Sequence, residues 1–120
     1  MVTVYVDGSF VNQGRADASA GVGVYFDDGT QHQYKGKLLG SHQGCARAEA
    51  EAVRRALLML NEPVGHGSPN ETAVICTDST YVLRNIDNAR RGRPVDGDDD
   101  IFGSITQLMA DSARPVTLEK

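Results

Sequence analysis

The first residues of the chain constrain it most, because they have the pattern of a strand that ends in a carboxylate. Valines stand at positions 2, 4 and 6, and this period of two is typical of a β-strand with one buried face. The run ends at Asp7, followed by Gly8 and Ser9, which is a loop signal. Because strands disfavour aspartate, a carboxylate at this position needs an explanation.

A second apolar run has the same ending. Residues 73–77 read Ala-Val-Ile-Cys-Thr and are followed by Asp78 and Ser79. An apolar run of this length predicts a central strand buried on both faces. If the two strands pair in parallel, Asp7 and Asp78 lie side by side at one edge of the sheet.

Length and composition narrow the class of protein. A chain of 120 residues predicts a single domain over residues 1–120. The net charge of −4 argues against a protein that holds nucleic acid mainly by bulk charge. Two cysteines and the absence of an apolar run of about 18 residues predict reduced thiols and no membrane span. The chain opens directly in a strand, so we expect no targeting peptide and a cytoplasmic location.

Apolar periodicity and turn signals predict eight elements. The predicted strands are 2–7, 20–26, 31–39, 73–77 and 116–119, and the predicted helices are 46–60, 80–86 and 101–110. We expect Asp99 or Asp100 to cap the last helix and residues 88–99 to form a charged linker. The helix between the third and fourth strands provides a crossover. The fold class is therefore α/β, with an antiparallel meander of three strands and two further strands parallel to the first.

The long helix places a third carboxylate near this edge. Its apolar stripe consists of Ala52, Val53, Ala56, Leu57 and Leu60, at helical spacing. Extending the stripe backwards reaches Glu49, which we expect to face the sheet. Glu51 points elsewhere and is expected to form an exposed ion pair with Arg55.

Three convergent carboxylates repel one another unless cations neutralise them. Oxygen ligands without His or Cys favour Mg²⁺ or Mn²⁺, and two such ions about 3.5–4 Å apart can clamp a phosphodiester and activate water. Taken singly, the aspartates also have ordinary structural explanations. Asp7 would then be a turn residue, and Asp78 would be the N-cap of the helix from Thr80.

Several motifs of the chain resemble those of the type 1 ribonuclease H family. The three acidic motifs are Tyr5–Ser9, Arg47–Glu49 and Cys76–Val82, and they occur in the family's order and spacing. The glycine-containing strand at 20–25 and the Arg93-Pro94-Val95 segment are also similar. The resemblance covers essentially the whole chain and implies a ribonuclease H-like fold.

The resemblance implies a function and a set of site residues. Family members cleave the RNA strand of RNA–DNA hybrids with two Mg²⁺ ions and leave 5′-phosphate and 3′-hydroxyl ends. The implied catalytic residues are Asp7, Glu49 and Asp78, which with Gly8 form the implied metal site. The implied nucleic-acid contacts are Ser9, Asn12, Gln13, Arg47, Ser79, Thr80 and Arg84. Glu49 is expected near the scissile 2′-hydroxyl.

The chain also departs from the family pattern. The family continues past the fifth strand with a His-containing loop, a fourth metal-binding aspartate and a helix, whereas this sequence stops at Lys120. We therefore expect a C-terminally short domain, and a homodimer or partner that covers the bare sheet face. The alternative function is a hybrid-binding module, or a subunit that needs a partner to complete its site.

Overall fold

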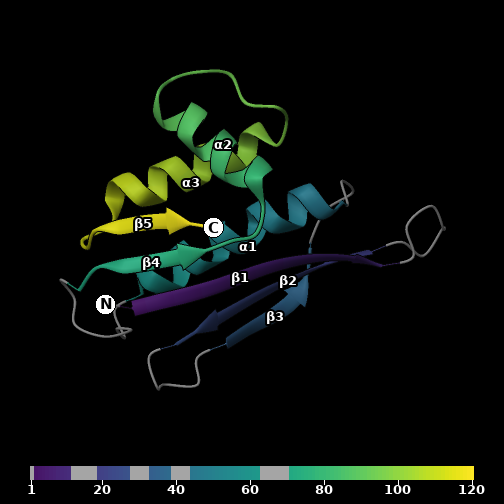
Figure 1. Ribbon diagram of the computed structural model, residues 1–120, viewed down its shortest axis with the longest axis horizontal. Coiled ribbons are helices and arrows are strands. Elements are labelled where there is room, and N and C mark those ends of the chain that lie inside the picture. The colour runs from purple at the N-terminus through teal and green to yellow at the C-terminus, as the bar shows by residue number, and fades with distance from the viewer. Residues whose placement is uncertain (1, 12–18, 28–32, 39–43, 63–70) are drawn as a thin grey trace.

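A computed structural model describes residues 2–11, 19–27, 33–38, 44–62 and 71–120 (Figure 1). In chain order the elements are β1 (Val2–Val11), β2 (Ser19–Phe26), β3 (Gln33–Lys37), α1 (Cys45–Leu60), β4 (Ala73–Cys76), α2 (Thr80–Arg90), α3 (Asp99–Asp111) and β5 (Val116–Glu119). The strands form one sheet in the order β3-β2-β1-β4-β5. β1 pairs antiparallel with β2, and β2 with β3, whereas β4 lies parallel to both β1 and β5. The predicted fold class is confirmed.

The alternation of the first strand decides which face of the sheet is buried. Val2, Val4 and Val6 are buried, whereas Tyr5 and Asp7 are exposed. The buried valines belong to one core cluster with the inner residues of β2 and the apolar stripe of α1. All five predicted stripe residues of α1 are buried, as expected.

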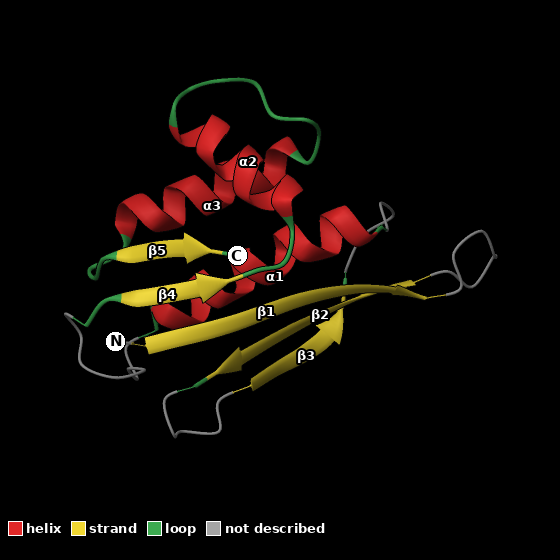
Figure 2. Cartoon of the chain, in the orientation of Figure 1, coloured by secondary structure: helices red, strands yellow, loops and turns green. Residues whose placement is uncertain are grey.

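The helices lie on one side of the sheet. Figure 2 shows α1 behind the strands, with α2 and α3 above it, and no described element covers the face turned to the viewer. On this open face Tyr5 and Tyr25 pair across β1 and β2 and are 49% and 48% exposed. Their ring centroids lie 6.5 Å apart. The open face therefore carries the exposed large apolar side chains of the described residues.

The bounds of several elements differ from the sequence-based prediction. β1 runs to Val11 rather than residue 7, because β2 continues to pair with it as far as Val11 and Ser19. α2 runs to Arg90 rather than Ile86, so the first residues of the predicted charged linker are helical. The predicted strand at 31–39 is described only from Gln33 to Lys37.

The N-cap of α3 is Asp98, and the prediction of Asp99 or Asp100 was wrong. Asp98 has a left-handed backbone (φ 52°) and its side chain makes no capping hydrogen bond. Instead its carboxylate accepts hydrogen bonds from Arg47 and Tyr81. A tertiary contact has therefore replaced the local cap.

The expected pair of Glu51 with Arg55 was also wrong. Glu51 lies 2.8 Å from Nε of Arg54, one turn along the helix. The guanidinium of Arg55 stacks over the Tyr34 ring of β3, 4.6 Å from its centroid, where the aromatic face attracts the cation.

Two further expectations concern the cysteines and the membrane. Cys45 and Cys76 do not form a disulfide with each other, and their reduced state stays a prediction. Among the described residues, no helix has an apolar stretch long enough to cross a bilayer.

Candidate active site

The register of the parallel strands aligns the two aspartates. Tyr5 of β1 pairs with Cys76 of β4, and two residues further along each chain stand Asp7 and Asp78. Parallel strands advance in step, so the two aspartates occupy matching positions at the carboxyl end of β4. Ligand sites of α/β sheets lie at such ends. The sequence-based prediction for these two residues agrees with this register.

Gly8 allows the backbone of Glu49 to lie close to β1. A Cβ atom at Gly8 would lie 2.4 Å from the backbone nitrogen of Glu49 and 2.6 Å from the carbonyl carbon of Ala48. Only a glycine therefore lets the first turns of α1 pack this closely on β1. Glu49 is half-buried, and its backbone lies directly over Gly8, the residue after Asp7.

The ordinary structural explanations for the two aspartates do not hold. Asp7 lies within β1 and pairs with Gly23 of β2, so it is not a turn residue. The N-cap of α2 is Ser79, whose Oγ accepts a hydrogen bond of 3.1 Å from the amide of Val82. Asp78 precedes this cap, and its exposed side chain is free of the capping role.

The three carboxylates have no counter-ion within the described part of the chain. Among the described residues, none donates a side-chain hydrogen bond or forms an ion pair to Asp7, Glu49 or Asp78. Within the same residues, the side chains are not gathered into a ready cluster of three metal-ligating groups. Carboxylate oxygens that have no partner among the described residues fit a hard divalent cation, and such a cation would draw the three side chains together.

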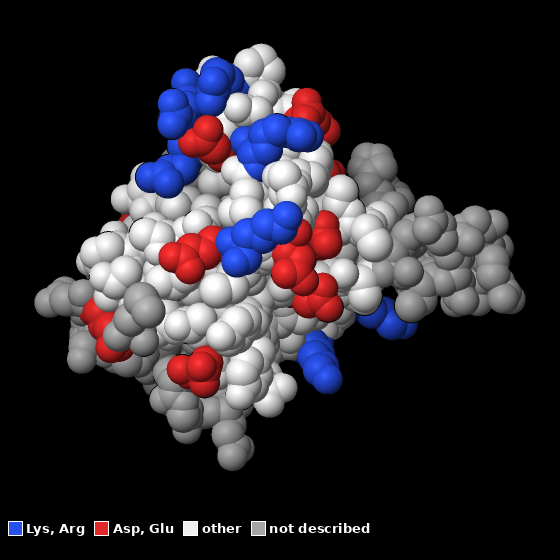
Figure 3. Space-filling model, in the orientation of Figure 1, with Lys and Arg blue, Asp and Glu red and all other residues white. Residues whose placement is uncertain are grey.

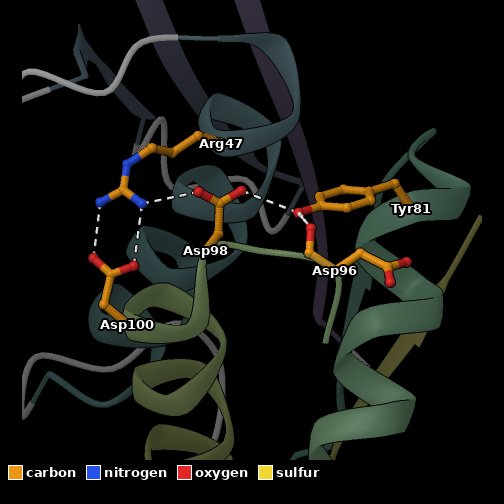
Figure 4. A network of polar contacts seen from close by, with 5 residues as sticks. All are labelled: Arg47, Tyr81, Asp96, Asp98 and Asp100. Carbon is orange, nitrogen blue, oxygen red and sulfur yellow. Dashed lines mark hydrogen bonds and ion pairs between the residues drawn. The ribbon is translucent and has the colours of Figure 1, made fainter. Parts of the chain in front are cut away.

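Beside this edge lies a polar network that holds the start of α3 (Figure 4). Arg47 donates to Asp98 Oδ1 at 2.9 Å and forms a bidentate pair with Asp100 at 2.8 and 3.1 Å. The hydroxyl of Tyr81 donates to the other oxygen of Asp98 at 3.0 Å. Arg47 comes from α1 and Tyr81 from α2, so the network joins all three helices.

The network shifts the acidities of its members. The hydrogen bond from Arg47 lowers the pKa of Asp100 to about 2, and the same bond raises the pKa of Arg47. Burial raises the pKa of Tyr81 to about 12, with the hydrogen bond to Asp98 acting in the same direction. All three shifts favour the neutral-pH protonation states, which are a charged Arg47, a charged Asp100 and a neutral Tyr81.

Several predicted nucleic-acid contacts have structural partners of their own. Besides Arg47, Arg84 forms an ion pair of 2.9 Å with Asp96, and the capping residue Ser79 is buried. Thr80 accepts a hydrogen bond from Lys120 at 3.1 Å. Their role as nucleic-acid contacts stays a prediction.

The remaining predicted contacts are Ser9, Asn12 and Gln13. Ser9 is exposed on β1 and pairs with Gly21, whereas Asn12 and Gln13 lie outside the described residues.

One residue of the site escaped the sequence analysis. A cavity of about 310 Å³ is lined by Asp7, Ser9, Gly21, Val22, Gly23, Lys35 and Gly36. Lys35 belongs to the edge strand β3, and its charge faces the same cavity as Asp7. The lysines at 35 and 37 alternate as exposed residues of a strand do, but only the strand register shows that Lys35 lies in the same row as Asp7.

Comparison with known protein families agrees with this geometry. The family model described as RNase H matches residues 1–117. The chain belongs to the RNase H family. The resemblance predicted from the acidic motifs is thereby confirmed, and the matched residues include the carboxylates of both strands and of α1.

A named relative has moderate sequence identity to this chain. The ribonuclease H of Saccharomyces cerevisiae is 35% identical over 83 residues, which make up 69% of this chain and 24% of the yeast protein. The chain therefore spans about a quarter of the length of that relative.

Solved structures share the fold. The RNase H domain of PFV matches with a TM-score of 0.69 at 21% identity, over 99% of this chain and 78% of that one. LC11-RNase H1, solved in complex with an RNA/DNA hybrid, matches with a TM-score of 0.71 at 20% identity, over 100% of this chain and 85% of that one. At these identities the likeness concerns the fold.

Proposed function

We propose that this RNase H family member is a divalent-metal-dependent endoribonuclease that hydrolyses the RNA strand of RNA–DNA hybrids. The products are 5′-phosphate and 3′-hydroxyl ends. The observation that supports the proposal is that the β1–β4 register and the close contact at Gly8 bring the backbone positions of Asp7, Asp78 and Glu49 to one end of the sheet, where no side chain of the described residues pairs with them. Carboxylates without a structural role at such an edge are suited to bind Mg²⁺ or Mn²⁺.

The residues have distinct roles in this proposal. Asp7 and Asp78 hold two cations from adjacent strands, and Gly8 provides the room for α1 to bring Glu49 to them. When bound, the cations neutralise the charge of the scissile phosphate and lower the pKa of the attacking water. Glu49 would complete the metal site on the side of the scissile 2′-hydroxyl. Because a 2′-hydroxyl distinguishes RNA from DNA without reference to the base, we expect little sequence specificity.

The first experiment compares substrates. The protein is incubated with an RNA–DNA hybrid, double-stranded RNA or double-stranded DNA, each in Mg²⁺ or Mn²⁺, and the ends of the products are analysed. Cleavage of the hybrid alone, lost in Asp7→Asn, supports the proposal. The matched control is Asp96→Asn, which removes an exposed aspartate of the same kind whose partner is Arg84.

Hybrid binding without cleavage in either metal would contradict the proposal. That result would support the alternative function, a hybrid-binding module or a subunit whose site a partner completes. Absence of both binding and cleavage would exclude both functions.

A partner for the open sheet face is part of the same proposal. Tyr5 and Tyr25 expose about half of their surface there, and exposed apolar surface favours association. We expect a homodimer or a bound partner, and light scattering that gives a monomer at all concentrations would contradict the homodimer. The proposed cytoplasmic location is tested by microscopy of a tagged protein.

A further inference from the structure

Lys35 lies in the same row of the sheet as Asp7. Asp7 pairs with Gly23, and Gly23 pairs with Lys35. Residues paired across strands point to the same face, and both Asp7 and Lys35 are exposed. With strands about 4.8 Å apart, the two backbone positions are separated by roughly 10 Å.

The space between them is open. The residue in the middle of the row is Gly23, and the nearest atom to a Cβ built there is the carbonyl oxygen of Asp7 at 3.8 Å. Gly21 and Gly36 also line the cavity of about 310 Å³ that Asp7 and Lys35 share, but Ser9 and Tyr34 occupy the space beside these two glycines, so the open point is Gly23. A polymer backbone can therefore approach the sheet at this point more closely than side chains would allow.

The charge of Lys35 is not used within the described part of the protein. In the residues that the structure describes, Lys35 forms no ion pair and no side-chain hydrogen bond. By contrast, Arg47 and Arg84 are held by aspartates. Figure 3 shows blue side chains adjoining red ones in the upper part of the view, over α2.

We propose that Lys35 contacts a backbone phosphate of the cleaved strand and positions that strand over Asp7. This inference rests on the proposed function. Phosphate contacts fix the register of a nucleic acid on a protein without reading its sequence. Lys35 fits this role because it lies on the edge strand and only Gly23 separates it from Asp7 in the row. Lys35 is a positioning residue, since it acts on the strand and not on the reacting atoms.

The test measures binding separately from cleavage. A fluorescein-labelled RNA–DNA hybrid is titrated by anisotropy with Asp7→Asn protein and with the same protein carrying Lys35→Ala. One phosphate contact contributes about one unit to the salt slope of log K, so we expect affinity to fall about five- to tenfold near 0.1 M salt and the slope to decrease by about 1. In protein with Asp7 intact, Lys35→Ala is expected to raise KM more than it lowers kcat, and Lys35→Arg is expected to restore KM.

Two further variants make the test specific. Lys37→Ala removes the same charge from the same face of β3, but Lys37 does not line the cavity with Asp7, so its effect is expected to be smaller. Gly23→Ala adds a methyl group to the cavity floor where the nearest atom is 3.8 Å away, and it is expected to weaken binding without lowering Tm.

The outcomes separate this inference from the proposed function. If the unaltered protein cleaves hybrid and Lys35→Ala behaves like Lys37→Ala, the inference is wrong and the function stands. If the protein binds hybrid in a Lys35-dependent way but does not cleave it, the phosphate contact of Lys35 stands and the proposed cleavage is wrong. If hybrid does not bind at all, both are wrong.

Discussion

Two acidic groups of this protein differ in whether described side chains pair with them. The first, which we call the catalytic edge because the proposed function assigns the metal site to it, consists of Asp7, Glu49 and Asp78. The second, the α3 cap group, consists of Asp98 and Asp100. Arg47 and Tyr81 satisfy the cap group, whereas no described side chain pairs with the catalytic edge.

The difference separates carboxylates with a structural partner from those that the proposed function uses. Arg47 stands only two residues before Glu49, yet its guanidinium reaches across to α3. The cap group therefore joins helices through ion pairs, whereas Glu49 of the catalytic edge is positioned by a backbone contact at Gly8. An acidic group without internal cations retains its capacity for external ones.

The largest expected effect comes from neutralising the catalytic edge. Asp7→Asn should reduce kcat on hybrid by about a thousandfold, since loss of a metal ligand removes several kcal/mol of transition-state stabilisation. Stability should stay the same or rise slightly, because one of three like charges is removed. Steady-state kinetics and thermal unfolding measure the two effects. Asp100→Asn serves as the control from the cap group, and activity of Asp7→Asn within tenfold of the unaltered protein would contradict the assignment.

The second prediction breaks the backbone contact. Gly8→Ala places a methyl group 2.4 Å from the backbone nitrogen of Glu49, so α1 must shift away from β1. We expect a loss of about 1–3 kcal/mol in the free energy of unfolding, as for other overpacked sites, together with loss of cleavage. Urea unfolding measures the change in the free energy of unfolding.

Gly103→Ala is the matched control for Gly8→Ala. No atom lies within 4 Å of a Cβ at Gly103, which is in α3, so this change should stabilise the protein by about 0.5–1 kcal/mol. Equal stability of the two variants would mean that α1 does not depend on Gly8.

The third prediction removes the cation of the α3 cap group. Arg47→Ala leaves Asp98 and Asp100 without their shared partner and should cost about 1–3 kcal/mol. The folded pKa of Asp100, about 2, lies below its unfolded value of about 3.9. Its stabilising contribution is therefore complete above about pH 4 and lost as pH falls toward 2.

The decrease in the free energy of unfolding at low pH tests this direction. Urea midpoints measured between about pH 5 and pH 2.5 should fall less steeply in Arg47→Ala than in the unaltered protein. The exposure of Asp100 keeps the difference small. An unchanged slope would show that Arg47 does not hold the carboxylate.

The smallest expected effect concerns Tyr81. Its folded pKa of about 12 lies above the unfolded value of about 10, so its contribution is complete below pH 10 and lost as pH rises through 12. Tyr81→Phe should cost about 1 kcal/mol, the value of one hydrogen bond, and should flatten the alkaline limb. Ultraviolet titration of the phenol measures the pKa directly, and a normal tyrosine value would contradict the contact with Asp98.

Local patterns in the sequence determined the elements and the candidate carboxylates. The alternation around Val4 specified which face of β1 is buried, because side chains of a strand alternate between faces. The stripe of α1 placed Glu49 toward the sheet by helical periodicity. The acidic motifs indicated the family, and the fold class followed from the order of strands and helices.

Only the tertiary structure decided which charges are free. A sequence gives no distance between Arg47 and Asp100, 53 residues apart, so it could not show that this arginine is engaged. It could not show that Ser79 rather than Asp78 caps α2, since both residue types are good caps. The strand register placed Lys35 across from Asp7, because the alignment of paired strands depends on turns and packing along their whole length.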